Sequence, residues 1–554
     1  MRKLLLFGLF QCLLLNAFPQ GFPAEIVIMQ IDRDFYVAGE PVLYQFSTLN
    51  ASTHRLSDNS KMGYVLLRNA QSKVVIKQRI VLEKGSTAGS FVLPDTLSSG
   101  IYQMVGFTNF MRNFGEKSYF QKEVIIVNQS DTEYNFLKKQ PPLAHSQSVA
   151  WQEKLKITID SDIYLPDRKV KVKIEPVSGN AKVSVSVFEN SNHPVSPVVP
   201  KIDIPVETTQ QQMKFQPETK GNILMGEVVD ETTQQPIAGA IVMLSCVDTV
   251  ANLQYAVTDS KGVFRFLLSN YYDGKELYLS LKNGIKEDGW KIRVEDKFAM
   301  SSKFRAVFSA TPDSNFIAKS QNIAYINKSY DVEVYQHHKS KENVMCPAPR
   351  FYYDGAKTLY PADYSSLDDF SEIVTELFPF LSIKKHANNS QIKVGGATSE
   401  QFEYNGPALF LDGIYMDNIN NILKLGSDKI KKIDVIYAER VLGDLVFQGV
   451  ISIVTKGNMK QTMPTSVNTL KIMNTDVANA DYLQIAAGLP DQNRKIPYVR
   501  QLLYWNPSVE IFNSKDTEFE FITSQNEGNY TILVQGISDN GLPVCVSKKF
   551  KVKK

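Results

Sequence analysis

Short runs of alternating apolar and polar side chains recur along most of this 554-residue chain. Val183–Val187 alternates strictly, Val42–Phe46 and Tyr64–Leu67 are further strand-like runs, and clusters of Gly, Asn, Asp and Ser separate such runs. Alternation with a period of two places one set of side chains on each face of a strand, and the intervening residues favour turns. The pattern predicts antiparallel β-sandwiches. Because the chain is too long for one hydrophobic core, we expect roughly three to five domains in tandem.

Charge and composition narrow the classes of partner. Lys and Arg total 61 against 58 Asp and Glu, so no basic excess steers the chain onto nucleic acid or an anionic membrane surface. Hydrophobic residues make up 43% of the chain, with 31 Phe and 25 Tyr, a composition that suits folded β-rich domains. We therefore expect no nucleic-acid partner and little disorder.

The first residues have the pattern of a secretory signal peptide. Met1–Lys3 is basic, and Leu4–Leu15 is an apolar run too short to span a bilayer. We assign residues 1–20 to a signal peptide and expect an exported protein. A lipoprotein is the alternative, although Cys12 lies inside the apolar run without the small residues that precede a lipid-modified cysteine. No later stretch is long enough for a transmembrane helix.

Three cysteines remain once the signal peptide is set aside. Cys246, Cys346 and Cys545 are an odd number, spread widely, and form no C-x-x-C metal motif. The pattern favours isolated thiols in the folded domains. One disulfide with a spare thiol is the alternative.

Residues 24–128 carry the first domain motif. The segments Tyr36–Glu40, Leu93–Tyr102 and Thr108–Asn113 resemble the macroglobulin (MG2-type) domains of large exported bacterial proteins. The resemblance implies a β-sandwich. Residues 150–190 repeat the pattern in degenerate form, in a second macroglobulin-like sandwich, and the Pro- and Gln-rich residues 191–220 are expected to be an extended linker.

A third module spans residues 221–310. Gly226–Asp230, Thr258–Gly262 and Val263–Phe266 are similar to the carboxypeptidase regulatory-like domain, including its "Thr-Asp-x-x-Gly-x-Phe" hairpin. That family is a small transthyretin-like sandwich, a packing and spacing module without hydrolytic residues. Residues 315–385, with one short helical pattern, are expected to be a connector.

Residues 386–460 show a mixed pattern. Gly406–Asp417 reads as a strand ending in an Asp-Gly turn, Asp428–Ile436 as a short amphipathic helix leading into a strand, and Gly449–Gly457 as a last strand. These segments resemble, in order and spacing, the plug of SusC-type TonB-dependent receptors. The resemblance implies a small α+β domain. The matching positions, with structural or interaction roles, are Pro407, Asp412, Gly413, Ile430, Ile433, Val435, Gly449, Val450, Ile453, Thr455 and Lys456.

The chain departs from that receptor family after the plug-like segment. A 22-strand barrel needs roughly 220 residues, whereas 554 minus 457 leaves 97. The strand signals in residues 466–554 indicate a soluble Ig-like β domain, so we expect no transmembrane barrel. Tyr437–Asp444 replaces the usual small-residue run and predicts a rebuilt loop. Transport by this polypeptide alone is therefore not expected.

Catalytic and cofactor motifs are absent from the sequence. No G-x-S-x-G, H-E-x-x-H, P-loop or G-x-G-x-x-G pattern occurs, nor does the Cys-Gly-Glu-Gln thioester element. His337–His338 lies in a polar stretch and suggests exposed loop residues, with a metal site as the alternative. Asp363, Asp368 and Asp369 are typical of helix caps and first-turn charges. We expect no enzyme, no cofactor and no small-molecule substrate.

Two functional hypotheses fit these features. The first is a periplasmic or outer-membrane-associated scaffold, whose plug-like domain binds or gates an outer-membrane β-barrel partner. The second is a surface-exposed or secreted protein whose sandwiches bind carbohydrate or host protein. An enzyme with an unrecognised site is the third and weakest possibility.

Overall fold

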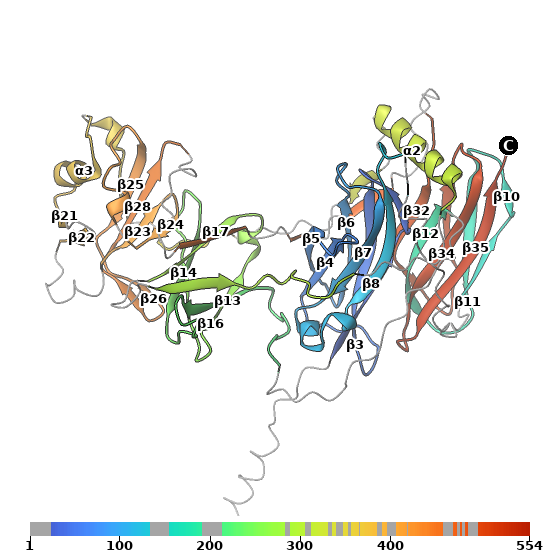
Figure 1. Ribbon diagram of the computed structural model, residues 1–554, viewed down its shortest axis with the longest axis horizontal. Coiled ribbons are helices and arrows are strands. Elements are labelled where there is room, and N and C mark those ends of the chain that lie inside the picture. Colours follow the sequence, from blue (N-terminus) through green and yellow to red (C-terminus); the bar gives the residue numbers. More distant parts are fainter. Residues whose placement is uncertain are drawn as a thin grey trace, which may run out of the picture. The chain divides into compact units, whose positions relative to one another are not determined.

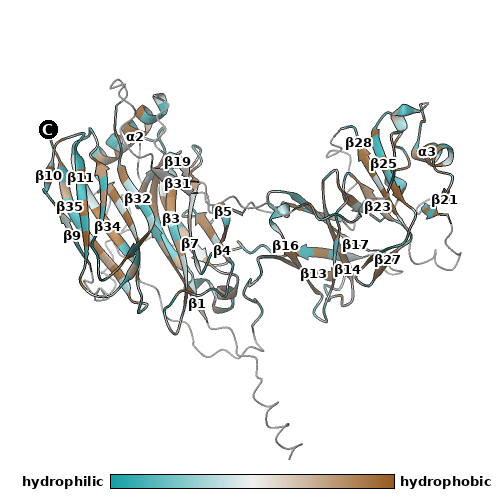
Figure 2. Ribbon diagram, turned by 180° about the vertical axis from the view of Figure 1, so that it is seen from behind, coloured by the Kyte–Doolittle hydropathy of each residue, from teal (hydrophilic) through white to brown (hydrophobic). Residues whose placement is uncertain are grey.

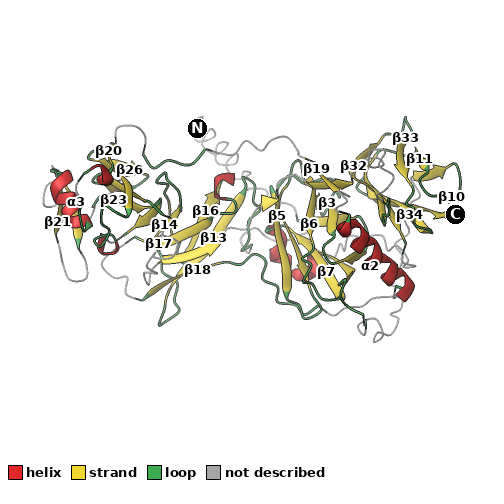
Figure 3. Ribbon diagram, turned by 90° about the horizontal axis from the view of Figure 1, so that it is seen from above, coloured by secondary structure: helices red, strands yellow, loops and turns green. Residues whose placement is uncertain are grey.

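A computed structural model describes most of the chain outside its N-terminal segment. The described residues are 24–132, 134, 155–190, 213–282, 289–304, 312–330, 335–338, 347–352, 356–364, 366–384, 390–395, 406–417, 419–457, 469–473, 477–478, 482–485 and 497–554. The predicted signal peptide, Cys346 and most of the predicted linker 191–220 lie outside these ranges. Strands dominate (Figure 3), which confirms the predicted fold class of tandem sandwiches with one α+β domain. Within these ranges α2 has 16 residues and α3 has eight, and neither can span a bilayer.

Contacts divide the chain into two compact units. The first unit comprises Met1–Gly221, Lys297–Asn343 and Ala478–Lys554, and the second comprises Asn222–Asp296 and Val344–Val477. The chain therefore passes from one unit to the other four times. Each unit contains two globular parts.

The first sandwich covers the predicted range 24–128 and gains one short edge strand from much later in the chain. One sheet contains β1 (Glu25–Ile31), β3 (Pro41–Asn50) and β6 (Ser86–Val92), and the other contains β2 (Phe35–Val37), β8 (Phe120–Val127), β7 (Gly100–Phe107), β4 (Met62–Arg68), β5 (Val74–Val81) and the remote two-residue strand β30 (Val477–Ala478). Large aromatic side chains fill the space between the sheets, and Tyr44, Phe46 and Tyr64 have no exposed surface. Burial of these large apolar side chains stabilises the sandwich.

The second sandwich is built from two distant parts of the chain. One sheet contains β9 (Leu155–Ile159), β11 (Lys169–Pro176) and β33 (Thr517–Ile522), and the other contains β10 (Ile163–Tyr164), β35 (Pro543–Val552), β34 (Gly528–Ser538), β12 (Ala181–Glu189) and β32 (Leu502–Ile511). Figure 1 shows these early and late strands interleaved, and Figure 2 shows the alternation of apolar and polar residues along them. A single core joins Val170 and Val185 to Tyr530 and Phe550.

This pairing corrects two predicted domains. Residues 150–190 do not form a sandwich alone, and residues 466–554 do not form a separate Ig-like domain. In its sheet β12 lies between β32 and β34. The first of these two strands, β32, begins 313 residues after β12 ends (502 minus 189), so both edges of β12 pair only with remote strands. In each half, apolar and polar residues alternate along the strands, so one face of the sheet is apolar. Neither half can cover that apolar face by itself.

The third sandwich, in the second unit, occupies most of the predicted range 221–310. One sheet contains β16 (Val263–Leu268), β13 (Asn222–Asp230) and β18 (Trp290–Val294), and the other contains β15 (Gln254–Val257), β14 (Ile241–Cys246), β17 (Glu276–Leu281) and β29 (Thr469–Met473). The predicted start agrees with the structure, whereas the predicted C-terminal boundary changes. β29 comes from much later in the sequence, and the chain beyond Asp296 belongs to the first unit.

The α+β domain begins earlier than the predicted residue 386. Its sheet has the order β20 (Lys357–Leu359), β25 (Ile430–Ile436), β28 (Val450–Thr455), β23 (Ala408–Leu411) and β24 (Ile414–Met416), with α3 (Phe370–Leu377) and the hairpin β21 (Leu381–Lys384) and β22 (Gln391–Val394) beside it. Asp369 caps α3 by accepting a hydrogen bond from Glu372 N at 2.8 Å. Phe370 and Ile373 then pack on the sheet. Part of the predicted connector 315–385 is therefore a structural element of this domain.

The first part of that connector forms α2 (Ser314–Ser329), which contacts both sandwiches of the first unit. Ile317 packs with Phe35 of the first sandwich, whereas Lys319 pairs with Glu189 of the second. Glu189 is buried, which raises the pKa of its carboxyl group. Nearby, β19 (Tyr335–His338) pairs with β31 (Tyr482–Ile485), and β30 (Val477–Ala478) is a short strand before it.

Two remote segments, 213–221 and 297–304, are held against the first sandwich by a buried ion pair. Lys297 Nζ lies 2.6 Å from Glu218 Oε1, and Tyr64 Oη donates to Glu218 Oε2 at 2.6 Å. The Glu218 side chain has no exposed surface. Burial lowers the pKa of Lys297, and the adjacent carboxylate opposes that shift. We call Glu218, Lys297 and Tyr64 the anchor cluster.

Candidate functional site

The predicted Asp-Gly turn joins β23 to β24 in the α+β domain. Asp412 has φ of +48° and Gly413 has φ of +84°, the left-handed conformation that such turns require. The Asp412 carboxylate accepts hydrogen bonds from Thr455 N and Thr455 Oγ1, each at 2.8 Å. Asp412 and Thr455 therefore tie the end of β23 to the end of β28.

The same turn lies against the third sandwich. Asp248 N donates to Asp412 O at 2.9 Å, and Tyr415 N donates to Ser245 Oγ at 3.1 Å. A Cβ atom on Gly413 would lie 2.7 Å from Asp248 O, so a side chain cannot be accommodated there. The glycine of the motif permits close contact between two domains of the second unit.

The remaining motif positions support the fold. The five apolar ones are at most 1% exposed, and they are Ile430, Ile433, Val435, Val450 and Ile453. Gly449 has φ of +101°, and a Cβ atom there would lie 2.6 Å from Ile436 O. Lys456 Nζ donates to Ser427 O at 3.2 Å, and Pro407 is half-buried before β23. The plug-like motif is thus a set of packing and turn residues.

The segment predicted as a rebuilt loop, Tyr437–Asp444, contains one strand of a hairpin and its turn. β26 (Arg440–Leu442) pairs with β27 (Leu445–Phe447). Asp444 N donates to Tyr255 Oη of the third sandwich at 3.0 Å. A hydrophobic cluster then joins Phe447 of the hairpin and Phe410 of β23 to Met243 of the third sandwich. We call this cluster the joint core.

The other residues noted in the sequence have structural positions. Asp369 is the cap of α3, as predicted for these acids, and Asp363 ends a 3-10 turn. His337 and His338 lie in β19 and not in a loop. Across the described ranges, no group of three His, Cys, Asp or Glu side chains could hold a metal ion.

The two cysteines within the described ranges are free thiols, as the favoured interpretation predicted. Cys246 is fully buried, and its Sγ lies 3.6 Å from Tyr271 Oη. Burial raises the pKa of Cys246 and raises that of Cys545 to about 11, so both thiols are held in the protonated, unreactive form.

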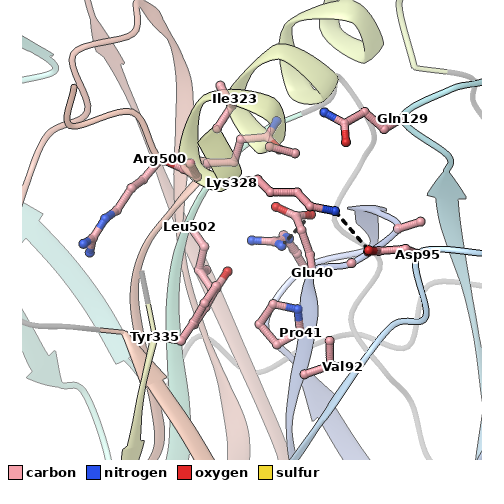
Figure 4. Close-up of a pocket in the computed structure, with 16 residues that line it drawn as sticks. Glu40, Pro41, Val92, Asp95, Gln129, Ile323, Lys328, Tyr335, Arg500 and Leu502 are labelled. Carbon is pink, nitrogen blue, oxygen red and sulfur yellow. Dashed lines mark hydrogen bonds and ion pairs between the residues drawn. The ribbon is translucent and has the colours of Figure 1, made fainter. Parts of the chain in front are cut away.

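A cleft of about 530 Å³ in the first unit was not predicted from the sequence. Its lining comes from three distant segments: the Arg33–Pro41 turn with Val92, Asp95 and Gln129, the C-terminal half of α2, and residues 500–502 with Tyr335. Figure 4 shows Tyr335 and Leu502 on one side and Pro41 and Val92 on the other. The sequence motif Tyr36–Glu40 marks one wall, but no local signal links it to the other two.

Two ion pairs lie in the cleft. Arg33 Nη2 is 2.9 Å from Glu40 Oε2, and Lys328 Nζ is 3.0 Å from Asp95 Oδ2 at the exposed rim (Figure 4). Below them Asp32 is fully buried and accepts hydrogen bonds from Leu43 N at 2.8 Å and from a tyrosine hydroxyl. Burial raises the pKa of Asp32 to about 6 despite the neighbouring guanidinium.

Two amide side chains in the cleft wall carry polar atoms without a hydrogen-bond partner among the residues that the structure describes. These atoms are Asn327 Oδ1 and Gln129 Nε2, both shielded from bulk water. Asn327 is otherwise held by donation from Nδ2 to Val499 O at 3.2 Å. A buried polar atom without a partner costs about 1–3 kcal/mol. These two amides therefore contribute one unsatisfied acceptor and one unsatisfied donor.

A second cavity of about 300 Å³ lies between the two sandwiches of the first unit. Polar side chains of β3 and β12, such as Gln45 and Ser184, line it together with Lys182. Lys182 Nζ donates to Ser86 Oγ at 3.0 Å across the junction. This cavity is part of a polar contact between the sandwiches.

Comparisons with known proteins give no family assignment. No family model and no curated protein matches the sequence. Solved structures that align with it include a Salmonella alpha-2-macroglobulin reacted with methylamine (9% identity, 96% of this chain, 23% of that chain, TM-score 0.16). Others are the native Escherichia coli alpha-2-macroglobulin (10%, 97%, 23%, TM-score 0.16) and an Escherichia coli adhesin (9%, 48%, 62%, TM-score 0.15). The chain spans about a quarter of the length of these two macroglobulins. These values assign no residue a role.

Proposed function

We propose that this chain is an exported, non-enzymatic binding or scaffold protein whose α+β domain is an interaction domain. The observation that carries the proposal is the joint core. Phe410 and Tyr415 of the α+β domain share one apolar cluster with Met243 and Leu253 of the third sandwich. Burial of this kind fixes one domain on the other, so the α+β domain is presented as part of a rigid body.

Two partly buried acids of the second unit, Asp434 and Asp248, have the environment of structural groups. Asp434 accepts hydrogen bonds from Tyr352, Thr358 and Lys432, and Asp248 accepts from Tyr271 and Lys275. In both carboxylates these bonds lower the pKa, although burial alone would raise it. Acids that are ionised and fully hydrogen-bonded are held in place and serve poorly as proton donors or acceptors.

The partner that we propose is an outer-membrane β-barrel protein, on the strength of the plug-like motif. The α+β domain offers exposed apolar side chains for such a contact. Phe380 is 62% exposed and Val441 is 64% exposed, and the Phe380 ring lies edge-on to Tyr437 at 5.8 Å between centroids. Large exposed apolar side chains are a feature of binding surfaces.

The test is affinity purification of the tagged full chain from detergent-solubilised envelopes, followed by identification of the proteins that co-purify. The double variant Phe380→Ser/Val441→Ser should lose the partner. Ile163→Ser, in the second sandwich and 61% exposed, is the matched control and should retain it. Recovery of the chain without any barrel protein, in wild type as in the variants, would contradict the proposed partner.

A surface-exposed or secreted binding protein is the second candidate function. The cleft of the first unit favours it, because a cleft of about 530 Å³ lies within the range of small-molecule and glycan sites. Protease treatment of intact cells separates the two candidates. A periplasmic chain should resist digestion until the outer membrane is permeabilised, whereas a surface protein should be cut at once.

A further inference from the structure

We propose that the cleft between the Arg33–Pro41 turn, α2 and Tyr335 binds a neutral, polyhydroxylated ligand, an oligosaccharide. The inference concerns the first unit and does not depend on the α+β domain or its partner. It stands on three properties of the cleft: its balanced charge, its unsatisfied amide atoms and its apolar walls.

Charge balance favours a neutral ligand. The two acids of the lining, Glu40 and Asp95, are each paired with a cation, Arg33 and Lys328 respectively. The guanidinium of Arg500 points away from the cleft in Figure 4. A charged ligand would have to compete with an existing pair and lose its own hydration, which is costly in a partly enclosed site.

The amide side chains favour hydroxyl groups. Asn327 Oδ1 needs a donor and Gln129 Nε2 needs an acceptor, and a hydroxyl group can act as either. Rotation of these side chains toward the cleft, combined with ligand binding, would satisfy both atoms. The ion-paired carboxylates of Glu40 and Asp95 retain lone pairs that can accept further hydroxyl donors.

The walls complement the C–H faces of sugar rings. Tyr335 and Leu502 form one side, Pro41 and Val92 the other, and Ile323 of α2 lies above them (Figure 4). An aromatic ring with a polar edge offers a flat apolar surface to a ring ligand. The hydroxyl of Tyr335 is held in its neutral form, because burial raises its pKa to about 12.

The test is a glycan array with the purified full chain, followed by calorimetry with the neutral oligosaccharide that binds best. Val92→Trp should lower the affinity at least tenfold, because Val92 is 56% exposed at the cleft wall and a larger side chain there occupies the ligand space. Gln129→Leu removes one hydrogen bond and should lower the affinity about 2- to 10-fold. Val81→Trp, on an exposed position of β5 outside the cleft lining, is the control and should bind like wild type.

Thermal unfolding of each variant shows whether its fold is retained. The proposal is overturned if no neutral oligosaccharide binds the wild-type chain, or if binding survives Val92→Trp in a folded protein. Preferential binding of charged glycans or of peptides would also overturn it. Failure of the envelope pull-down would leave this inference intact, because the two experiments concern different units of the chain.

Discussion

The first and second sandwiches of the first unit are similar in size and differ in how the chain builds them. All strands of the first except the two-residue edge strand β30 lie within residues 24–128, so nearly all its strand partners are near one another in sequence. The second is completed only when β32–β35 reach β9–β12. A sandwich with local partners can fold as soon as it is synthesised, whereas one closed by remote strands depends on everything between them.

The second sandwich also tolerates a large insertion between two of its strands. The second unit and α2 are inserted between two neighbouring strands of one sheet, β12 and β32, without disturbing their pairing. The entropy cost of closing a loop rises slowly with its length, so a large folded insertion is compatible with a stable sheet.

Truncation after Gly457 should break the second sandwich and spare the first. Loss of β32–β35 removes both neighbours of β12 and half of a shared core, including Tyr530 and Phe550. Limited proteolysis with mass spectrometry should find the 24–132 region protected and the 155–190 region cut. Protection of residues 155–190 in the truncated chain would contradict the split-domain architecture.

Lys297→Met should loosen the contacts of the first sandwich with remote segments and leave its core intact. Removing the cation beside the buried Glu218 carboxylate should cost about 3–5 kcal/mol locally. Hydrogen exchange should rise in residues 213–221 and 297–304 and stay unchanged in β3 and β7.

The matched control for this substitution is Lys169→Met in the second sandwich. Lys169 pairs with Glu520 on the surface, with side chains 64% and 41% exposed, and such pairs contribute about 0–1 kcal/mol. Equal effects from the two substitutions would show that the anchor cluster is no more important than a surface pair.

Asp32→Asn should change how the stability of the first sandwich depends on pH. The folded-state pKa of Asp32, about 6, lies above its ordinary value of 3.8, so its ionisation favours the unfolded state. The sandwich should therefore lose up to about 3 kcal/mol as the pH rises from about 4 through 6, and Asp32→Asn should remove that loss. Burial also raises the pKa of Glu25, so a dependence of the same sign should remain in the Asp32→Asn variant.

Urea unfolding read by pulse proteolysis at pH 4.5 and pH 7 measures this effect for each sandwich separately. In the second sandwich the exposed acids Glu175 and Glu520 have lowered pKa values because lysines pair with them. Their contribution has the opposite sign and is screened by solvent. A first sandwich that becomes more stable with rising pH would contradict the assigned role of Asp32.

Local patterns predicted those parts of the fold whose partners are close in sequence. The first sandwich and the Asp412–Gly413 turn appear where the residues indicated, because alternation and turn chemistry act over a few positions. The cap of α3 at Asp369 is another such case. The pairing of β12 with β32 and β34 was missed, since a period-two pattern states which face is buried and not which strand lies beside it.

The cleft shows the same limit for function. Its walls come from residues near 33–41, 323–328 and 500–502, and no one of these segments has a binding motif. The plug-like motif shows the opposite case. It is recognisable in the sequence, but its residues pack one domain against another, as the contact of Gly413 with Asp248 shows.

The sequence by itself therefore determined the secondary-structure class, the individual turns and the balance of charge, because these depend on neighbouring side chains. Tertiary structure alone decided that four passages between two units complete the domains, that the α+β domain is fixed on the third sandwich, and that three remote segments enclose the cleft. The physical reason is that burial of apolar surface rewards any complementary partner, near or far, and the choice among partners is made only when the whole chain is packed.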